Sequence, residues 1–252
     1  MSGRFNALAL KAGLAWIGFL VALGCVLAAL GAGLGVRFGW WHYREGIGSL
    51  LYVFWTALGT AGACLVIAGF NLARASRRAL ALSLAGVLVA GVTAWIPYNL
   101  RMTASSVPPI HDITTDLADP PKFVKVVTLR KPGDHPAEYD GPKAGELQKK
   151  GYPDLAAQSF PVPKDKVAAA ASKVLADMGL EIVEADPAQG RVEATATSTL
   201  FGFKDDVVVR IAEANGAAHV DLRSKSRVGR NDFGMNAKRI REFQARLKAA
   251  LA

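Results

Sequence analysis

Three long apolar runs in the first hundred residues restrict what this chain can fold into more than any other feature. They cover residues 12–36, 49–72 and 79–97, and none contains Asp, Glu, Lys, Arg or His. A helix that crosses a bilayer needs about 20 mostly apolar residues, with a range of ~17–25. A cleaved signal peptide explains the first run less well, because that run is long and two more follow at once. The sequence therefore predicts a three-helix transmembrane anchor over residues 1–103.

Charged and aromatic residues at the ends of these runs predict their orientation. Five Lys or Arg residues flank the spans on the membrane side that holds the N-terminus, and three flank them on the opposite membrane side. The five are Arg4, Lys11, Arg74, Arg77 and Arg78. The aromatic segments WWHY, YVFW and WIPY all fall on the other side, as an interfacial belt would. By the positive-inside rule we expect the N-terminus in the cytoplasm and everything after Tyr98 in the periplasm of a two-membrane bacterium.

The predicted spans lack the charged side chains that usually mark an ion or proton pathway. Their hydroxyl residues can bond within their own helices, and small residues four positions apart suit either close helix contact or a simple glycine-tolerant anchor. Both cysteines, Cys25 and Cys64, lie in the spans, so the rest of the chain has no disulfide, thiol nucleophile or cysteine metal site. We interpret the region as a packed anchor or docking surface.

The remainder, residues 104–252, is predicted to be a separate domain that begins with an extended segment. Residues 104–163 hold ten of the twelve prolines, and pairs such as VPPIH and ADPPKF favour extended backbone. The segment is too apolar around Ile110 and Phe123 for a purely solvated linker. We therefore expect it to lie along the folded domain, with a short strand near residues 123–129.

After residue 163 the hydrophobic pattern predicts an α+β domain. KDKVAAAASKVLADMGL, residues 164–180, has apolar residues at helical spacing. Four strand-like runs follow, separated by the turn signals DPAQG, FGFK and EANG. NDFGMNAKRIREFQARLKAALA, residues 231–252, again has one apolar helical stripe. Short connections favour an antiparallel meander, so the order helix, four strands, helix predicts a sheet with both helices on one face.

Alternation along the strands predicts two different sheet faces. Val192 and Ala194 point opposite to Glu193, and Leu222 points opposite to Arg223. One face is small or apolar and suits the helices, whereas the other is rich in charge. Because antiparallel sheets commonly have one solvated face, we expect the charged face to be exposed.

RSKSRVGRNDFGMNAKRIR, residues 223–241, is a dense cluster of arginine and lysine around a turn with two glycines. Arginines beside a helix N-terminus form a natural site for phosphate or carboxylate. The alternative is that Asp232 fills this place as helix cap and arginine partner. We expect Arg223, Arg227, Arg230 and Arg239 to surround the turn, with Asp232 partly buried among them. The candidate binding residues are Arg223, Ser226, Arg227, Arg230, Asp232, Asn236 and Arg239.

Four segments together resemble the DUF1499 family of domains of unknown function. They are PPIHDITTD (108–116), GYPDL (151–155), TSTLFGFKDDVVVRI (197–211) and the basic stretch at 223–241. The resemblance covers about residues 104–250. It implies a domain found in bacteria and plastids, often behind membrane spans, and it implies no particular reaction.

His111 and Asp112 form a secondary candidate site. A histidine beside acids in a loop can act as a base or metal ligand, which supports the alternative of an unrecognised membrane-anchored enzyme that uses this pair with the C-terminal arginines. No second histidine lies at ligand spacing and no catalytic motif surrounds the pair. We therefore expect His111 and Asp112 to hold the proline-rich segment by hydrogen bonds, with no metal and no cofactor.

Together these patterns predict an inner-membrane protein that presents a periplasmic module for binding or assembly. The expected partners are membrane lipid and a protein partner or anionic ligand. Nucleic acid is not an expected partner, because the basic end would lie outside the cytoplasm and the predicted sheet lacks exposed aromatic residues for base stacking.

Overall fold

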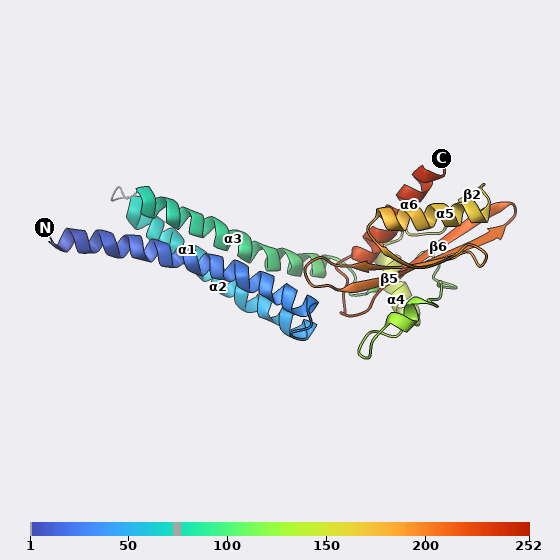
Figure 1. The fold of residues 1–252 in the computed structure, drawn as a ribbon, viewed down its shortest axis with the longest axis horizontal. Helices are drawn as coiled ribbons and strands as arrows, with labels where there is room; N and C mark the ends of the chain where they lie inside the picture. Colours follow the sequence, from blue (N-terminus) through green and yellow to red (C-terminus); the bar gives the residue numbers. More distant parts are fainter. Residues whose placement is uncertain (1, 73–76) are drawn as a thin grey trace. The chain divides into compact units, whose positions relative to one another are not determined.

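A computed structural model describes residues 2–72 and 77–252 of the chain, which form two compact units (Figure 1). One unit contains the chain up to Met102 together with Thr199–Gly202, and the other contains Thr103–Ser198 and Phe203–Ala252. Arg74, one of the cations behind the predicted orientation, lies outside the described residues.

The first unit is built from three long apolar helices. They are α1 (Ser2–Arg37), α2 (Tyr43–Leu72) and α3 (Arg77–Ser106). Each is long and apolar enough to cross a membrane. The predicted spans are thus confirmed as candidate membrane helices, and each helix extends several residues beyond its apolar run.

Small and hydroxyl residues let these helices approach one another. A Cβ atom at Gly86 of α3 would lie 2.7 Å from Cys64 Sγ of α2, so only glycine allows this contact without a shift. Ser83 donates its hydroxyl proton to Ala79 O at 2.8 Å, and Thr93 donates to Val89 O at 2.7 Å. These hydroxyls are satisfied within α3, as an apolar environment requires.

The second unit contains a six-stranded antiparallel sheet in the order β1-β6-β5-β4-β3, with β2 also paired to β6. The strands are β1 (Asp112–Thr114), β2 (Gln158–Phe160), β3 (Glu181–Asp186), β4 (Arg191–Thr197), β5 (Lys204–Ala214) and β6 (Ala217–Ser226). The last four are the predicted meander. Two short strands are added to it, since β1 and β2 pair one after the other along the same edge of β6.

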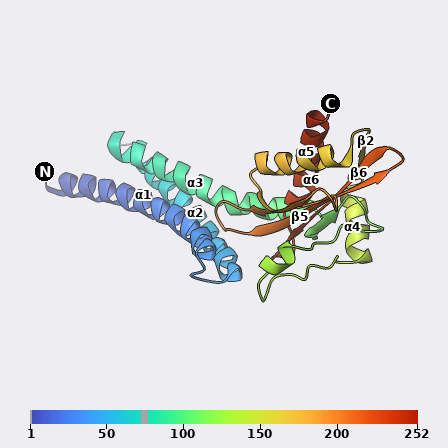
Figure 2. The ribbon, with the colours of Figure 1, turned by 45° about the vertical axis from the view of Figure 1, so that its right-hand side comes forward.

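The sheet is covered on both faces (Figures 1 and 2). Helices α5 (Lys164–Asp177) and α6 (Met235–Ala250) pack on one face, where Val192, Val209 and Leu222 join them in the main hydrophobic core. The other face is covered by residues 115–141, which we call the strap. The strap leads into α4 (Pro142–Gly151), which packs near β1.

The strap corrects two expectations. Residues 123–129 do not form a strand: Val126–Leu129 form a 3-10 helix, η1, because the amides that a strand would pair with a neighbour are bonded to a side chain instead. The charged face of the sheet is also not solvent-exposed. The strap buries it, and Glu193, Asp206, Arg223, Lys225 and Arg227 are all buried.

Candidate functional site

The charged face under the strap brings buried ionisable groups of three strands together. It draws on alternate positions of β4, β5 and β6, the same positions that strand alternation assigned to one face. Burying a charge is costly unless it is paired and hydrogen-bonded. The hydrogen-bond and ion-pair partners of each buried charged group therefore show its role in the fold.

Arg223 joins β6 to β1 and to the strap. Its Nε and Nη2 donate to the two carboxylate oxygens of Asp112, each at 2.8 Å. The guanidinium also donates to the strap carbonyls of Pro121 and Ala137. Its centre lies 4.7 Å from the ring centroid of Phe123, a cation–π contact. Arg223 and Asp112 thus form a two-pronged buried pair between β6 and β1, and the same guanidinium holds the strap through its two carbonyls.

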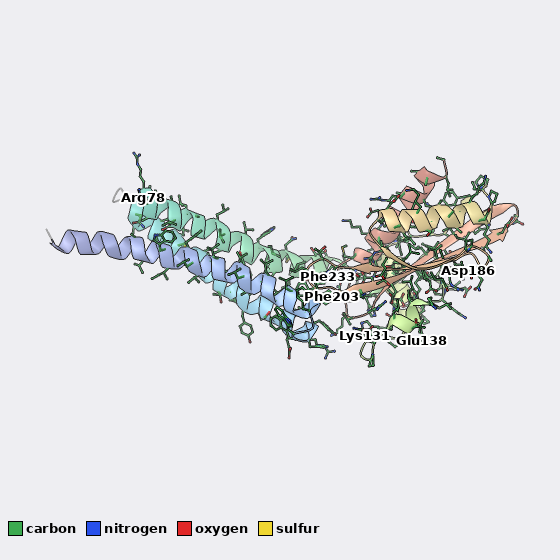
Figure 3. The ribbon with its side chains drawn as sticks, viewed as in Figure 1. Arg78, Lys131, Glu138, Asp186, Phe203 and Phe233 are labelled. Carbon is green, nitrogen blue, oxygen red and sulfur yellow. The ribbon has the colours of Figure 1, made fainter. Side chains whose placement is uncertain are left out.

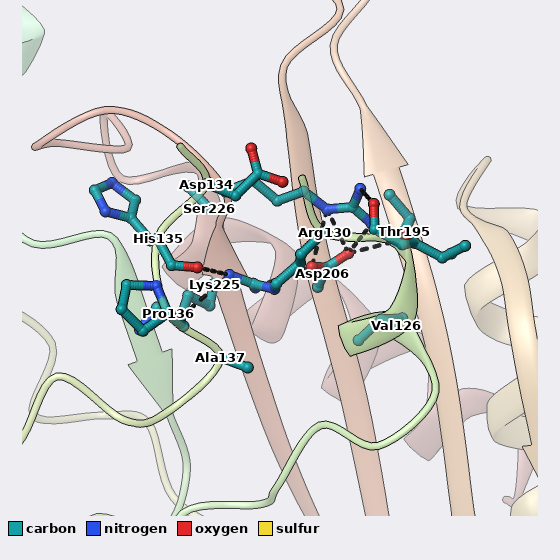
Figure 4. A network of polar contacts seen from close by, with 12 residues as sticks. Val126, Arg130, Asp134, His135, Pro136, Ala137, Thr195, Asp206, Lys225 and Ser226 are labelled. Carbon is teal, nitrogen blue, oxygen red and sulfur yellow. Dashed lines mark hydrogen bonds and ion pairs between the residues drawn. The ribbon is translucent and has the colours of Figure 1, made fainter. Parts of the chain in front are cut away.

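Arg227 and Arg130 share one carboxylate, that of Asp206, and Figure 4 shows Arg130, Thr195 and Asp206 close together. Arg227 Nη2 donates to Asp206 Oδ1 at 2.7 Å, and Arg130 Nη2 of the strap lies 2.9 Å from Asp206 Oδ2. Thr195 Oγ1 donates to Asp206 Oδ1 at 3.0 Å. Burial lowers the pKa of Arg130 from its ordinary value, while Asp206 opposes that shift. Two cations therefore meet one fully buried acid, and further acceptors for them come from backbone carbonyls.

The side chain of Glu193 holds the strap by binding backbone amides of the strap. Its carboxylate accepts hydrogen bonds from the amides of Val124, Lys125 and Val126 at 2.8, 2.9 and 2.8 Å. These amides begin η1, so Glu193 acts as an anionic cap supplied from β4. The carboxylate is fully buried and also pairs with Arg191 at 3.2 Å. No local sequence signal links residue 193 to residues 124–126, because the contact exists only once the sheet has formed.

His111 lies at the edge of this network, beside Asp140. Lys225 Nζ donates to Asp140 Oδ1 at 2.7 Å, and His111 Nε2 lies 3.2 Å from Asp140 Oδ2. The His111 ring stacks on His135 with centroids 4.0 Å apart. Burial lowers the pKa of His111, so the ring is neutral near pH 7. Together with the Asp112 pair, these contacts support the prediction that His111 and Asp112 hold the proline-rich segment in place.

A second polar cluster lies on the opposite face of β6, against α6. Ser224 Oγ donates to Asn236 Oδ1 at 2.6 Å, and Asn236 Nδ2 donates to Ser226 Oγ at 3.0 Å. Arg239 Nη1 donates to Ser224 Oγ, and its Nη2 donates to Asp205 Oδ2 at 2.8 Å. An anion at this position would have to displace Asp205, which already fills the place.

Asp232 organises the turn between these elements. Its Oδ1 accepts from the Gly234 amide and its Oδ2 from the Asn236 amide, both at 2.9 Å. Asp232 thus binds an amide in the first turn of α6, as the capping interpretation predicted. Burial raises its pKa from the ordinary value. None of the described arginines forms an ion pair with it, so the expected role as arginine partner is not found.

The seven candidate residues do not form one site. Arg223 and Arg227 extend under the strap rather than around the turn, which corrects the expected arrangement of four arginines. Ser226, Asn236 and Arg239 lie together on the α6 face. Arg230 is exposed, and its side chain makes no hydrogen bond or ion pair within the described part of the chain. Sequence reasoning also overlooked Asp206, Glu193 and Arg130, whose roles depend on contacts between distant segments.

Three candidate membrane helices and an α+β domain with a strapped antiparallel sheet define a membrane-anchored protein. The family model for DUF1499, described as a protein of unknown function, matches residues 112–247. The match covers more than half of the chain and includes β1, the strap, the sheet and most of α6. The chain belongs to the DUF1499 family. A comparison with curated proteins finds no match.

Proposed function

We propose that this protein is anchored in a bacterial inner membrane with its N-terminus in the cytoplasm, and that its periplasmic DUF1499 domain is a binding or assembly module for a protein partner. The orientation rests on the positive-inside bias of the flanking charges. The binding role rests on one observation: a rigidly held segment of the strap exposes large apolar side chains.

That segment carries Val124, Val127 and Leu129, which are 50%, 41% and 45% exposed. The buried residues Phe123 and Val126 pack the same segment against Val208 of the sheet. Glu193 holds the amides of the segment from below. The apolar side chains are therefore presented on a fixed backbone, and little conformational entropy would be lost when a partner covers them. We call Val124, Val127 and Leu129 the apolar ridge.

The surroundings of the apolar ridge indicate the chemistry of the partner. The exposed residues Lys122, Lys125 and Lys131 flank it, and none of these three ammonium groups has an ion pair among the described residues. A shallow groove of about 310 Å³ opens beside it, lined by Pro121, Val124 and Arg191 among others. A protein surface with apolar side chains bordered by Asp or Glu would fit this combination.

The alternative, an enzyme that uses His111, Asp112 and the C-terminal arginines, has less support. Asp112 is fully buried and both of its oxygens are bonded to Arg223. Arg227 Nε likewise donates to both carboxylate oxygens of Asp206. A substrate would have to break these pairs before it could meet the groups.

Photo-crosslinking in living cells tests the binding role. Benzoylphenylalanine would replace Val127 in the full-length protein, and a matched control would replace Lys173, an exposed residue of α5. We expect a discrete crosslinked protein from position 127 and none from position 173. The double variant Lys122→Glu, Lys125→Glu should abolish the product at unchanged protein level. If position 127 gives no discrete product, or if position 173 gives the same one, the proposed docking face is wrong.

A further inference from the structure

We propose that Arg230, Phe233, Met235 and Lys238 form a membrane contact that binds anionic phospholipid headgroups on the side of the bilayer where the third span ends. We call these four residues the basal patch. The inference goes beyond the proposed function, because it concerns a lipid surface at another part of the domain and does not depend on the protein partner or on which compartment holds the domain.

A short covalent tether joins the third span to the turn that carries the basal patch. The third apolar run ends at Pro97 and Tyr98. Asn231 Nδ2 donates to Ala104 O at 3.0 Å, and the Asp232 amide donates to Ile110 O at 3.3 Å. Six residues of chain reach at most roughly 20 Å even when fully extended. The turn at residues 229–234 is thus held close to the bilayer surface whatever the angle between the domain and the membrane helices.

Large apolar side chains are exposed in and next to that turn. Phe233 is 38% exposed and Met235 is 48% exposed. Phe233 also has a φ of 56°, in the left-handed region that a bulky residue rarely adopts. Asn231 Oδ1 accepts the Phe233 amide at 2.7 Å and so holds this conformation. The fold uses polar bonds to keep an aromatic ring at the surface, where it contributes little to the core.

Phe233 also lies at the end of the domain where the chain enters from the third span. Figure 3 shows Phe233 and Phe203 at one end of the sheet and Asp186 at the other. The strand pairing agrees, because Phe203 directly precedes β5, and the start of β5 pairs with the end of β6 at Ser226. The Ser226 amide donates to His111 O at 2.9 Å, so the chain enters the domain at this same end.

The basal patch also carries two cations. Arg223, Arg227 and Arg239 are all paired with acids, whereas Arg230 and Lys238 are exposed and lack an ion pair among the described residues. The nearest acid along the chain, Asp232, is buried and bonded to amides. Aromatic or apolar side chains beside unpaired cations are the combination that binds the interface of an anionic bilayer. A protein partner would explain the apolar residues, but the tether argues for lipid.

Nitroxide depth measurement on the full-length protein tests the proposal. A spin label would be attached at Phe233→Cys in a Cys25→Ala, Cys64→Ala background, with Lys173→Cys as the matched control. The protein would be reconstituted into nanodiscs of phosphatidylcholine alone or of phosphatidylcholine with phosphatidylglycerol. We expect the accessibility of label 233 to a water-soluble nickel reagent to fall several-fold below that of label 173, with the larger fall in phosphatidylglycerol discs.

Charge-reversal variants test the role of the two cations in the basal patch. Arg230→Glu with Lys238→Glu should remove the phosphatidylglycerol effect, and added free phosphate should not reproduce it. Equal water accessibility at 233 and 173 in both discs would overturn the membrane contact. A crosslink from position 233 to a protein in cells, together with a water-exposed label in discs, would assign the patch to a protein instead.

If the cysteine-free background does not reconstitute, benzoylphenylalanine at position 233 of the natural chain can report lipid adducts, and their absence would again contradict the proposal. A loss of the Val127 crosslink leaves these results unchanged, so the two proposals fail separately.

Discussion

At the scale of single residues, the molecule separates charges that build the fold from charges that are available to a partner. Arg223, Arg227 and Arg239 looked equivalent to Arg230 in the sequence, since all four lie within one basic stretch. The period of two along β6 places the first two under the strap, and the helical start of α6 places Arg239 beside Asp205. Of these four arginines, Arg230 in the turn itself is the one without an ion pair among the described residues.

Asp232 gives a prediction at this scale. Replacing it with alanine removes the acceptor for the Gly234 and Asn236 amides, and we expect the free energy of unfolding of the domain to fall by about 1–2 kcal/mol. Asp232→Asn keeps one acceptor oxygen and should cost less. Asp165→Ala, an exposed acid in the first turn of α5, is the control and should cost ~0.3–1 kcal/mol. Hydrogen exchange of the α6 amides in the full-length protein measures these differences.

The same residue predicts a dependence on pH. Burial raises the pKa of Asp232, so the folded state binds this proton more tightly than the unfolded chain does. The wild type should therefore lose stability relative to Asp232→Asn as the pH rises from about 3.9, the ordinary value for aspartate, through the raised folded pKa. A difference that stays constant between pH 4 and pH 7 would contradict this account.

At the scale of elements, the strap shows where pattern reasoning ends. Alternation identified the two faces of β4 and β6 correctly, and helical spacing located α5 and α6, because those signals are local. The proline-rich segment was expected to lie along the domain, but the face that it covers could not be predicted. The bonds of the strap join residues 67–69 positions apart at Glu193 and 86 or 102 positions apart at Arg223. The apolar run at residues 123–129 resembles a strand, yet a buried carboxylate takes its amides.

Helix α4 was overlooked although the sequence carries its signals. Pro142 stands at its first position and Lys149 and Lys150 lie in its last turn, both typical of helix ends. The prolines of residues 104–163 instead favoured extended backbone. Gln148 on this helix bonds both the amide and the carbonyl of Thr114, so β1 and α4 stabilise each other.

Glu193 provides the element-scale prediction. Glu193→Gln removes a buried charge that binds three amides and Arg191, and we expect a loss of roughly 3–5 kcal/mol in the free energy of unfolding. Glu184→Gln is a matched control, because Glu184 pairs with the same arginine at 2.8 Å but is 31% exposed, and should cost ~0–1 kcal/mol. Hydrogen exchange at the amides of residues 124–126 should accelerate in the first variant and not in the second. Similar exchange in both would show that Glu193 does not hold the strap.

At the scale of the whole molecule, three membrane helices leave the two ends of the chain on opposite sides of a bilayer if all three cross it. The cations that set the predicted orientation lie near the N-terminus, at residue 74 and at the start of α3. The family assignment is independent of this orientation, because it rests on residues 112–247 alone.

Reporter fusions test the orientation. Alkaline phosphatase, which is active only outside the cytoplasm, should be active when fused after Ala252 and inactive when fused after Ala75. A cytoplasmic reporter should give the opposite pattern at the same two points. If phosphatase is active after Ala75 and inactive after Ala252, the domain is cytoplasmic, and nucleic acid becomes a partner to reconsider for its basic C-terminal stretch.

The pairing of β1 with β6 also sets the order in which the domain can fold. Asp112 emerges early during synthesis or export, whereas its partner Arg223 emerges more than a hundred residues later. Until β6 arrives, the charged face under the strap is incomplete, because Arg223 and Lys225 are still missing from it. Contacts between distant residues slow folding, because the entropy cost of closing a long loop comes before the stabilising contacts form. A chain moving through a translocation channel would therefore stay thin and unfolded until its last quarter has passed, and the domain would then close in a late, concerted step.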